Sequence, residues 1–169
     1  MAGISEDVFG YKDTVTRSMF VTILAKIDGS DLTAYEGKSS FSDVKTDGWY
    51  TAAIEWAYQN GYAAGLGDGI FGYKADVSRE QIAMFFYTYS SKVGVDVSAK
   101  ADITGFADYD RIHDYARDAM AWAVEAGLIA GTGENHVSPR ASATRSEIAV
   151  IVMNYVETVK NAVVETPAE

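Results

Sequence analysis

The chain has 169 residues, a formal net charge of −10 and a pI of about 4.6, and this acidity argues against a broad phosphate-binding face for nucleic acid. The absence of cysteine excludes disulfides, thiolate zinc sites and a cysteine nucleophile, and the two histidines, His113 and His136, are too isolated to predict a metal site. No run of 18 apolar residues predicts membrane insertion, and no signal-peptide pattern opens the sequence.

The sequence predicts five main helices of two alternating types. In chain order, they are an apolar helix after Thr16, residues 49–60, an apolar helix after Ser78, residues 116–126, and an apolar helix after Thr144. Residues 49–60 and 116–126, the first-type helices, are Ala-rich and are each followed by Gly, as at a helix C-terminus. The three others, the second-type helices, each follow a Thr or Ser that suits an N-cap. We therefore expect an all-α chain.

The second-type helices differ in their predicted caps. Ser78 with Gln81, and Thr144 with Glu147, match the S/T-x-x-E/Q capping box, in which two side chains satisfy two backbone N–H groups. Met19 stands at the corresponding place in the first of these helices. The capping box is therefore expected in two of the three helices.

The chain is built from internal repeats. The segment "FGYKDTVTR" at residues 9–17 recurs as "FGYKADVSR" at residues 71–79 and, more weakly, as "VSPRASATR" at residues 137–145. A second pair of repeats, residues 41–65 and 106–131, shares F-x-D, a Trp within the helix and G-x-x-x-G. The sequence thus contains about two and a half copies of one unit, and the first copy lacks its first-type helix.

Taken together, F-x-D, an aromatic residue before an Ala-rich helix, G-x-x-x-G and a Thr/Ser-Arg helix start resemble the S-layer homology (SLH) family. Departures are Tyr11 and Tyr73 in place of Pro, Gln81 in place of Glu, and Tyr115 in place of Trp. The resemblance implies tandem SLH repeats in a pseudo-threefold helical bundle. It also implies non-covalent attachment to Gram-positive cell walls, through grooves between units that bind secondary cell-wall polysaccharide, commonly with ketal-linked pyruvate.

The repeats predict one domain over residues 1–164. It comprises a partial unit at residues 1–30 and two further units at residues 41–93 and 106–160, and residues 165–169 are interpreted as a tail or the start of a linker. The Pro and acidic residues of that tail are typical of a linker.

Two cations recur in each copy. Each pair has a spacing of five residues, and the pairs are Lys12 and Arg17, Lys74 and Arg79, and Arg140 and Arg145. One interpretation is that the second cation of each pair forms an ion pair with a neighbouring carboxylate. The other is that both cations bind a ligand carboxylate at a capped helix N-terminus, where backbone N–H groups already favour an anion. The resemblance to SLH modules favours ligand binding.

Other repeated residues also allow two interpretations. Asp43 and Asp108 either cap local turns or accept hydrogen bonds from a sugar. Trp49 either covers the core or offers a flat platform for a sugar ring, and Tyr115 is its counterpart. We count all four among the predicted ligand-binding residues.

Two glycines complete the predicted ligand-binding residues, and two tryptophans are expected in the core. Gly65 and Gly131 are expected to provide a positive φ or a close backbone approach, and a bare backbone beside a ligand would be a second benefit. Trp56 and Trp122 lie mid-helix between Ala residues and are expected in the core.

The sequence therefore predicts a non-catalytic anchoring module of the extracellular cell surface that binds a pyruvylated secondary cell-wall polysaccharide without a cofactor. An alternative is a protein-interaction or self-assembly module, because the incomplete first unit leaves an apolar surface for self-association. An enzyme ranks third, since no catalytic motif occurs.

Overall fold

A computed structural model describes residues 10–160. It divides into two compact units, residues 15–77 and a second unit to which residues 10–14 and 78–160 belong. The repeat segment at residues 1–3, Phe9 and the tail at residues 165–169 lie outside the described residues. The single domain over residues 1–164 accordingly stays a prediction.

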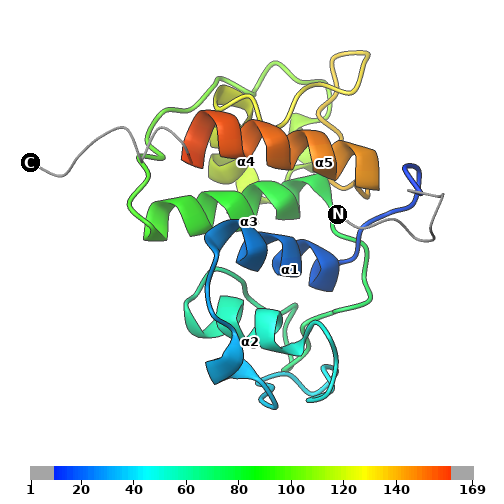
Figure 1. The fold of residues 1–169 in the computed structure, drawn as a ribbon. Helices are drawn as coiled ribbons and strands as arrows, with labels where there is room; N and C mark the ends of the chain where they lie inside the picture. The colour runs from blue at the N-terminus through cyan, green and yellow to red at the C-terminus, as the bar shows by residue number, and fades with distance from the viewer. Residues whose placement is uncertain (1–9, 161–169) are drawn as a thin grey trace, which may run out of the picture. The chain divides into compact units, whose positions relative to one another are not determined.

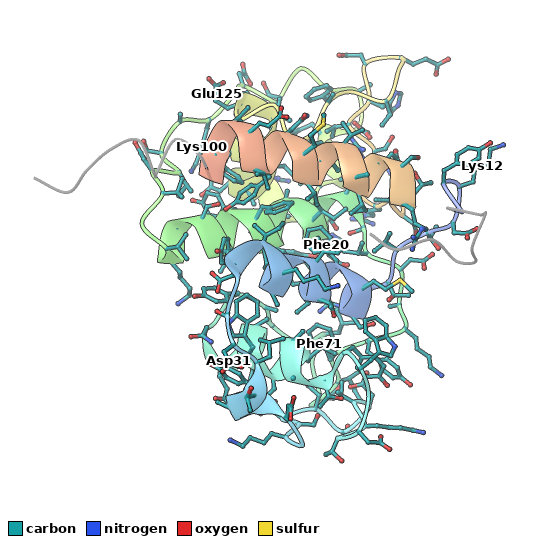
Figure 2. The ribbon with its side chains drawn as sticks, in the orientation of Figure 1. Lys12, Phe20, Asp31, Phe71, Lys100 and Glu125 are labelled. Carbon is teal, nitrogen blue, oxygen red and sulfur yellow. The ribbon has the colours of Figure 1, made fainter. Side chains whose placement is uncertain are left out.

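In the unit of residues 15–77, two helices pack on each other. The helices are α1 (Arg17–Asp28) and α2 (Thr51–Gln59), with a short 3-10 helix, η1 (Thr33–Tyr35), between them in sequence (Figure 1). Phe20 of α1 and Phe71 of the later loop are both fully buried, and Figure 2 labels both side chains. Trp56 of α2 is also buried, at 2% exposure, as the sequence predicts.

The other unit contains the remaining helices. They are α3 (Arg79–Lys92), η2 (Tyr109–Arg111), η3 (Asp114–Ala116), α4 (Arg117–Glu125), α5 (Arg145–Asn154) and the π-helical turn η4 (Tyr155–Lys160). α3 and α5 run side by side (Figure 1), and Phe86 stacks on Tyr155 with ring centroids 4.2 Å apart. The Tyr155 hydroxyl is hydrogen-bonded to Ser90 Oγ at 2.9 Å, so the buried phenol has a polar partner. Trp122 of α4 is 3% exposed and confirms the predicted core position.

The predicted all-α class is confirmed. Within residues 10–160 the five main helices occur at the expected places, and β-pairing is limited to isolated bridges. α2 begins two residues later than the predicted helix over residues 49–60, because Gly48 accepts from the Thr51 N–H in a turn that precedes the helix. No helix in the described part of the chain is long and apolar enough to cross a membrane.

The predicted caps of the second-type helices are confirmed. Ser78 and Thr144 each form a complete capping box, whereas Thr16 accepts from the backbone N–H of Met19 without the reciprocal bond of a capping box. Gly29 ends α1 in the left-handed conformation, at φ 81°. Local sequence therefore determines where these helices begin.

Each second-type helix starts against the loop of another copy. We call residues 10–15, 71–77 and 137–143 the approach loops, because each leads into a second-type helix. The first backbone N–H of each helix donates to one of these loops in cyclic order, with bonds from Arg17 to Ala75 (2.9 Å), Arg79 to Ala141 (3.1 Å) and Arg145 to Asp13 (2.8 Å). In all three copies, the start of the second-type helix is thus hydrogen-bonded to the approach loop of another copy.

Removing a cap tests the role of local sequence. We expect Ser78→Ala to lower the free energy of unfolding by about 1 kcal/mol, because the Gln81 N–H loses its acceptor. Urea unfolding followed by circular dichroism measures the change. Ser91→Ala, at an exposed position near the end of the same helix, is the matched control, and equal effects of the two changes would contradict the cap.

Candidate functional site

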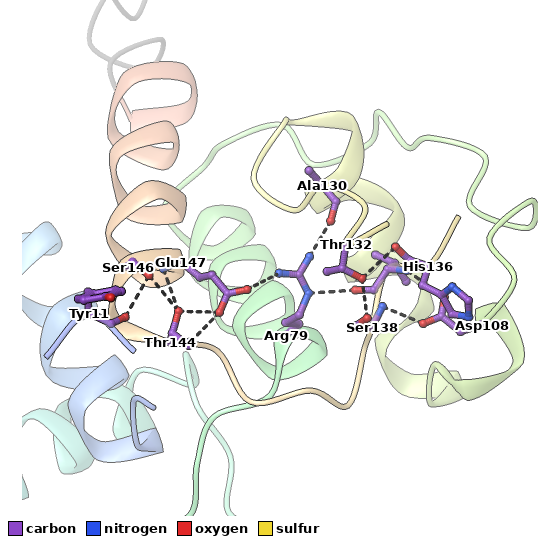
Figure 3. A network of polar contacts seen from close by, with 11 residues as sticks. Tyr11, Arg79, Asp108, Ala130, Thr132, His136, Ser138, Thr144, Ser146 and Glu147 are labelled. Carbon is purple, nitrogen blue, oxygen red and sulfur yellow. Dashed lines mark hydrogen bonds and ion pairs between the residues drawn. The ribbon is translucent and has the colours of Figure 1, made fainter. Parts of the chain in front are cut away.

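Arg79 is the first residue of α3, and its guanidinium is buried. Its Nε donates to the Val137 carbonyl at 2.9 Å, and its Nη2 donates to the Ala130 carbonyl at 2.6 Å (Figure 3). Nη1 lies 3.7 Å from Oε1 of Glu147. Burial lowers the pKa of Arg79, although the carboxylates of Glu147 and Asp108 favour its charged form. The side chain therefore links α3 to the segments that follow α4.

Asp108 binds the approach loop at residues 137–143, which also accepts a hydrogen bond from Arg79. Its two carboxylate oxygens accept from the backbone N–H groups of Val137 at 2.9 Å and Ser138 at 2.8 Å (Figure 3). Asp108 is only 4% exposed. The Val137 backbone is thus bound at its carbonyl by Arg79 and at its N–H by Asp108, which fixes the position of the loop.

The unit of residues 15–77 repeats this arrangement. Arg17, 3% exposed, donates to the carbonyls of Phe71 at 3.0 Å and Ala64 at 2.9 Å. Asp43 accepts from the N–H groups of Phe71 and Gly72, both at 2.8 Å. Desolvation acts to raise the pKa of Asp43, but its backbone hydrogen bonds outweigh that effect and lower the pKa overall. Both Asp residues therefore cap loops, as one interpretation predicts.

A groove opens beside Arg79. It has a volume of about 450 Å³ and lies between the segment that follows α4 and one side of α5. Its lining combines backbone, small side chains, polar groups and a few apolar groups: Arg79, Gly127, Leu128, Ala130, Gly131, Thr132, Ser146, Glu147, Val150, Ile151 and Asn154. A buried cation, hydroxyl groups and a bare glycine in one open groove suit a polar ligand that carries an acid group.

The other predicted cations lie on the surface. Lys12 and Lys74 are exposed, and each ammonium group lies over the neighbouring tyrosine ring, at 5.5 Å and 5.4 Å from the ring centroids. Arg140 is exposed and its Nε donates to the Arg111 carbonyl at 2.8 Å. The structure therefore brings Arg79 and Gly131 together in the groove, while Arg140 lies outside its lining.

Arg145 occupies the third of the repeated arginine positions. By the repeat spacing, the carbonyls that correspond to the acceptors of Arg17 belong to Ala2 and Phe9, which lie outside the described residues. The Arg145 backbone N–H donates to Asp13. Ligand binding by its side chain stays a prediction.

The two predicted aromatic platforms are exposed. Trp49 is 64% exposed and makes an edge contact with Tyr50 at 5.3 Å. Tyr115 is 59% exposed and stacks on the ring of His113 at 5.2 Å. The His113 ring is hydrogen-bonded to the buried carboxylate of Glu80, which orients it. Both aromatic residues are accessible to a ligand, and Trp49 does not cover the core.

Gly65 lies where its own backbone closely approaches Ile70 and Phe41. A Cβ at Gly65 would lie 2.6 Å from the Ile70 carbonyl oxygen and 2.7 Å from the Phe41 ring, whereas a Cβ at Gly131 would lie 3.4 Å from the His136 carbonyl oxygen. Neither glycine has a positive φ. Of the two predicted alternatives, the close backbone approach therefore occurs at Gly65, and the positive φ occurs at neither glycine.

Sequence reasoning did not assign a ligand-binding role to several residues of the groove. Thr132 directly follows the G-x-x-x-G motif, while Glu147, Val150 and Asn154 recur at helical spacing along α5. The helical spacing could have indicated that these residues share one face. It could not have indicated that this face meets the segment after α4.

Comparison with known proteins supports the same family. The S-layer homology domain pattern matches residues 40–83 and 105–149, which together make up more than half of the chain. The chain belongs to the S-layer homology domain family. The two matched SLH segments each contain F-x-D, a first-type helix and the start of a second-type helix, as the sequence predicts.

Several larger proteins contain a similar SLH region. The chain is 30% identical to an exoglucanase, XynX, of Acetivibrio thermocellus over 94% of its own length and 14% of that protein. It is 30% identical to an amylopullulanase of Thermoanaerobacterium thermosulfurigenes, over 92% of the chain and 8% of that protein. It is 28% identical to a surface-layer 125 kDa protein of Lysinibacillus sphaericus, over 86% of the chain and 12% of that protein.

The chain therefore spans a small fraction of these relatives. The similarity concerns the SLH region and not the full length of either enzyme. The predicted place at the cell surface is confirmed by membership of the SLH family and by the surface-layer relative.

Alanine at the two glycines tests the close approach. We expect Gly65→Ala to destabilise the protein by about 1–3 kcal/mol, because the methyl group would overlap backbone at Ile70. Gly131→Ala is the matched control and is expected to change stability much less. Thermal unfolding of both variants measures the difference, and equal stability would contradict the assignment.

The pH dependence of stability tests Asp43. Its pKa is lower in the folded than in the unfolded state, so its contribution is present above the unfolded pKa of about 4 and is lost as the pH falls further. We expect Asp43→Asn to cost about 1–3 kcal/mol at pH 7 and clearly less at pH 3. Urea unfolding at both pH values checks this, with Asp110→Asn at an exposed site as the control. A penalty independent of pH would contradict it.

Proposed function

We propose that this chain is a non-catalytic module that anchors a protein to the bacterial cell wall by binding an anionic polysaccharide in the groove beside Arg79. The observation that carries the proposal is a buried guanidinium on the wall of an open groove that also contains a glycine and hydroxyl groups. A cation removed from water interacts with a ligand acid more strongly than an exposed cation does.

The ligand that fits best is a sugar with a carboxylate substituent, such as the ketal-linked pyruvate of a secondary cell-wall polysaccharide. Arg79 donates two of its hydrogen bonds to backbone carbonyls, and its Nη1 is directed toward the Glu147 carboxylate at 3.7 Å. A ligand carboxylate would compete with Glu147 for that group. The hydroxyls of Thr132 and Ser146 lie in the same lining and suit neighbouring sugar hydroxyls.

Most of the other predicted residues would contact a long polymer at the surface of the protein. Lys12, Lys74 and Arg140 are exposed cations that attract an anionic chain, and Trp49 and Tyr115 are exposed rings that suit the apolar face of a sugar. Arg17 and Arg145 are the counterparts of Arg79 in the other copies. Asp43, Asp108 and Gly65 would act indirectly, because they hold the loops in place.

The proposal contains no catalytic step. The similarity to the exoglucanase and the amylopullulanase covers 14% and 8% of those proteins, so their named activities are not assigned to this chain. The relatives have different names but share one region with this chain. A separate anchoring module that occurs in otherwise different proteins would explain this.

Isothermal titration with two forms of one wall-polysaccharide fragment tests the proposal. We expect the pyruvylated fragment to bind, and the same fragment after mild acid removal of pyruvate to bind at least tenfold more weakly. Equal affinity for the two fragments would contradict recognition of the acid group. Absence of binding to both would contradict the anchoring function.

A charge change inside the groove tests the role of Arg79 without removing its structural bonds. We expect Glu147→Gln to raise the affinity for the pyruvylated fragment about fivefold, because a carboxylate that competes for Arg79 is removed. Gln preserves the capping box, as Gln81 does in α3. Glu157→Gln, on the turn after α5, is the control. Unchanged or weaker binding by Glu147→Gln would contradict a carboxylate site at Arg79.

A further inference from the structure

Two tyrosines in the unit of residues 15–77 lie ring to ring. Tyr50 directly precedes α2, and Tyr73 belongs to the approach loop of residues 71–77. Their ring centroids are 4.7 Å apart, with 33° between the ring planes. The Tyr50 hydroxyl donates to the Tyr73 hydroxyl oxygen. Both side chains are partly exposed, so the two phenols are within reach of a reagent in solution.

Backbone contacts hold both tyrosines in position. The Tyr73 N–H donates to the Asp43 carboxylate at 3.4 Å. The Tyr73 carbonyl accepts from the N–H of Ser18 at 3.3 Å and from its hydroxyl at 2.8 Å. The Tyr50 ring lies against the Gly48 backbone, since a Cβ added at Gly48 would be 2.7 Å from Tyr50 Cζ. The two rings are therefore held together by contacts that do not depend on their hydroxyl groups.

The tyrosine pair occurs in one copy of the repeat and is not required by the packing of the repeat. In the repeat register, Tyr50 and Tyr73 correspond to Ala116 and Pro139. The copy with Ala116 and Pro139 has the same arginine and aspartate contacts to its approach loop as the copy with the two tyrosines. A role specific to the two phenols is therefore sought in their chemistry.

Neighbouring groups favour the phenolate form of Tyr73. The hydrogen bond from Tyr50 lowers the pKa of Tyr73, and the ammonium groups of Lys74 and Lys45 act in the same direction. The Lys74 ammonium lies 5.4 Å from the Tyr73 ring centroid. Desolvation and the hydrogen bond to Tyr73 raise the pKa of Tyr50. Because a phenolate gives up an electron more readily than a phenol, Tyr73 is the ring that is oxidised first.

We propose that Tyr50 and Tyr73 form a site of oxidative cross-linking, at which a one-electron oxidant joins the two rings as dityrosine. The oxidant is of the peroxidase class, with hydrogen peroxide as the electron acceptor. Each tyrosine loses one electron and one proton, and the two tyrosyl radicals form a bond between ring carbons ortho to the hydroxyls. The hydrogens on those carbons move to the oxygens. The protein thus loses two hydrogen atoms, and one hydrogen peroxide becomes two water molecules.

Proximity makes coupling within one chain the preferred reaction. Two rings in contact have a high effective concentration, so their radicals couple faster than radicals on separate molecules. The product closes the chain between residues 50 and 73, which constrains the unfolded state as a disulfide would. The sequence has no cysteine for a disulfide. A tyrosine cross-link is a covalent constraint that these residues can supply at the cell surface.

Oxidation of the purified chain tests the proposal. The chain at micromolar concentration is treated with a peroxidase and hydrogen peroxide, and dityrosine fluorescence and intact mass are measured. We expect a fluorescent monomer that is lighter by two hydrogen atoms. Cleavage after glutamate separates the two tyrosines at Glu55, so joined peptides of residues 37–55 and 56–80 identify the link. Products that are mainly cross-linked dimers would overturn the proposal.

Substitution of single tyrosines assigns the two rings. Tyr50→Phe and Tyr73→Phe each keep the ring and remove the hydroxyl, and we expect at least tenfold less dityrosine fluorescence from either variant. Tyr58→Phe is the matched control, because Tyr58 belongs to the same unit, is 44% exposed and is expected to leave the yield unchanged. Equal yields from the three variants would overturn the assignment.

A second tyrosine pair in the chain gives an internal comparison. The rings of Tyr89 and Tyr155 have centroids 6.4 Å apart, and the two residues are 5% and 1% exposed. We expect no link between them, because their rings are farther apart and are buried away from the oxidant. A link that forms as readily at Tyr89 and Tyr155 as at Tyr50 and Tyr73 would contradict selection by the folded structure and overturn the proposal.

Discussion

The arrangement of the copies depends on a buried arginine whose guanidinium donates to backbone carbonyls. Arg17 and Arg79 each reach from the start of a second-type helix to two carbonyls of the following copy. A cation at the N-terminus of a helix opposes the helix dipole, and its burial removes it from water. Fixed carbonyl acceptors compensate for both costs, so the contact requires the loop of the next copy to be in one position.

Two aspartates also fix the position of these loops, because they accept from backbone N–H groups where the arginines donate to backbone carbonyls. In the same approach loops, Asp108 accepts from two backbone N–H groups and Asp43 accepts from three. One residue in each loop, Phe71 or Val137, is thereby bound at both its N–H and its carbonyl. The Val137 carbonyl, held in this way, is a fixed acceptor for Arg79, which lines the groove. Rigidity of a binding site reduces the entropy lost when a ligand binds.

The comparison of α3 with α5 shows how neighbours change the role of one sequence pattern. Both helices have a complete capping box and an apolar face that packs in the core. On α3 a second face is covered by α4, whereas the corresponding residues of α5, Ala149 and Met153, are exposed. Equivalent residues of the repeat therefore differ in exposure within the part of the chain that the structure describes.

Local features of this protein were determined by its sequence alone. Helix starts at Thr16, Ser78 and Thr144, the capping boxes, the repeats and the buried positions of Trp56 and Trp122 follow from spacing and side-chain type, which act within a few residues. The motifs also indicated the SLH family. These features could be predicted because their interactions join residues that are close in the chain.

Only the tertiary structure decided what the repeated arginines and aspartates bind. The sequence suggested a carboxylate partner or a ligand for Arg79, and the structure shows two backbone carbonyls more than 50 residues away, with Glu147 at 3.7 Å. Carbonyl and N–H groups are the same at almost every residue, so no sequence pattern marks which of them will be the partner. The groove itself forms where the segment after α4 meets α5, and the distance between such segments is set by packing.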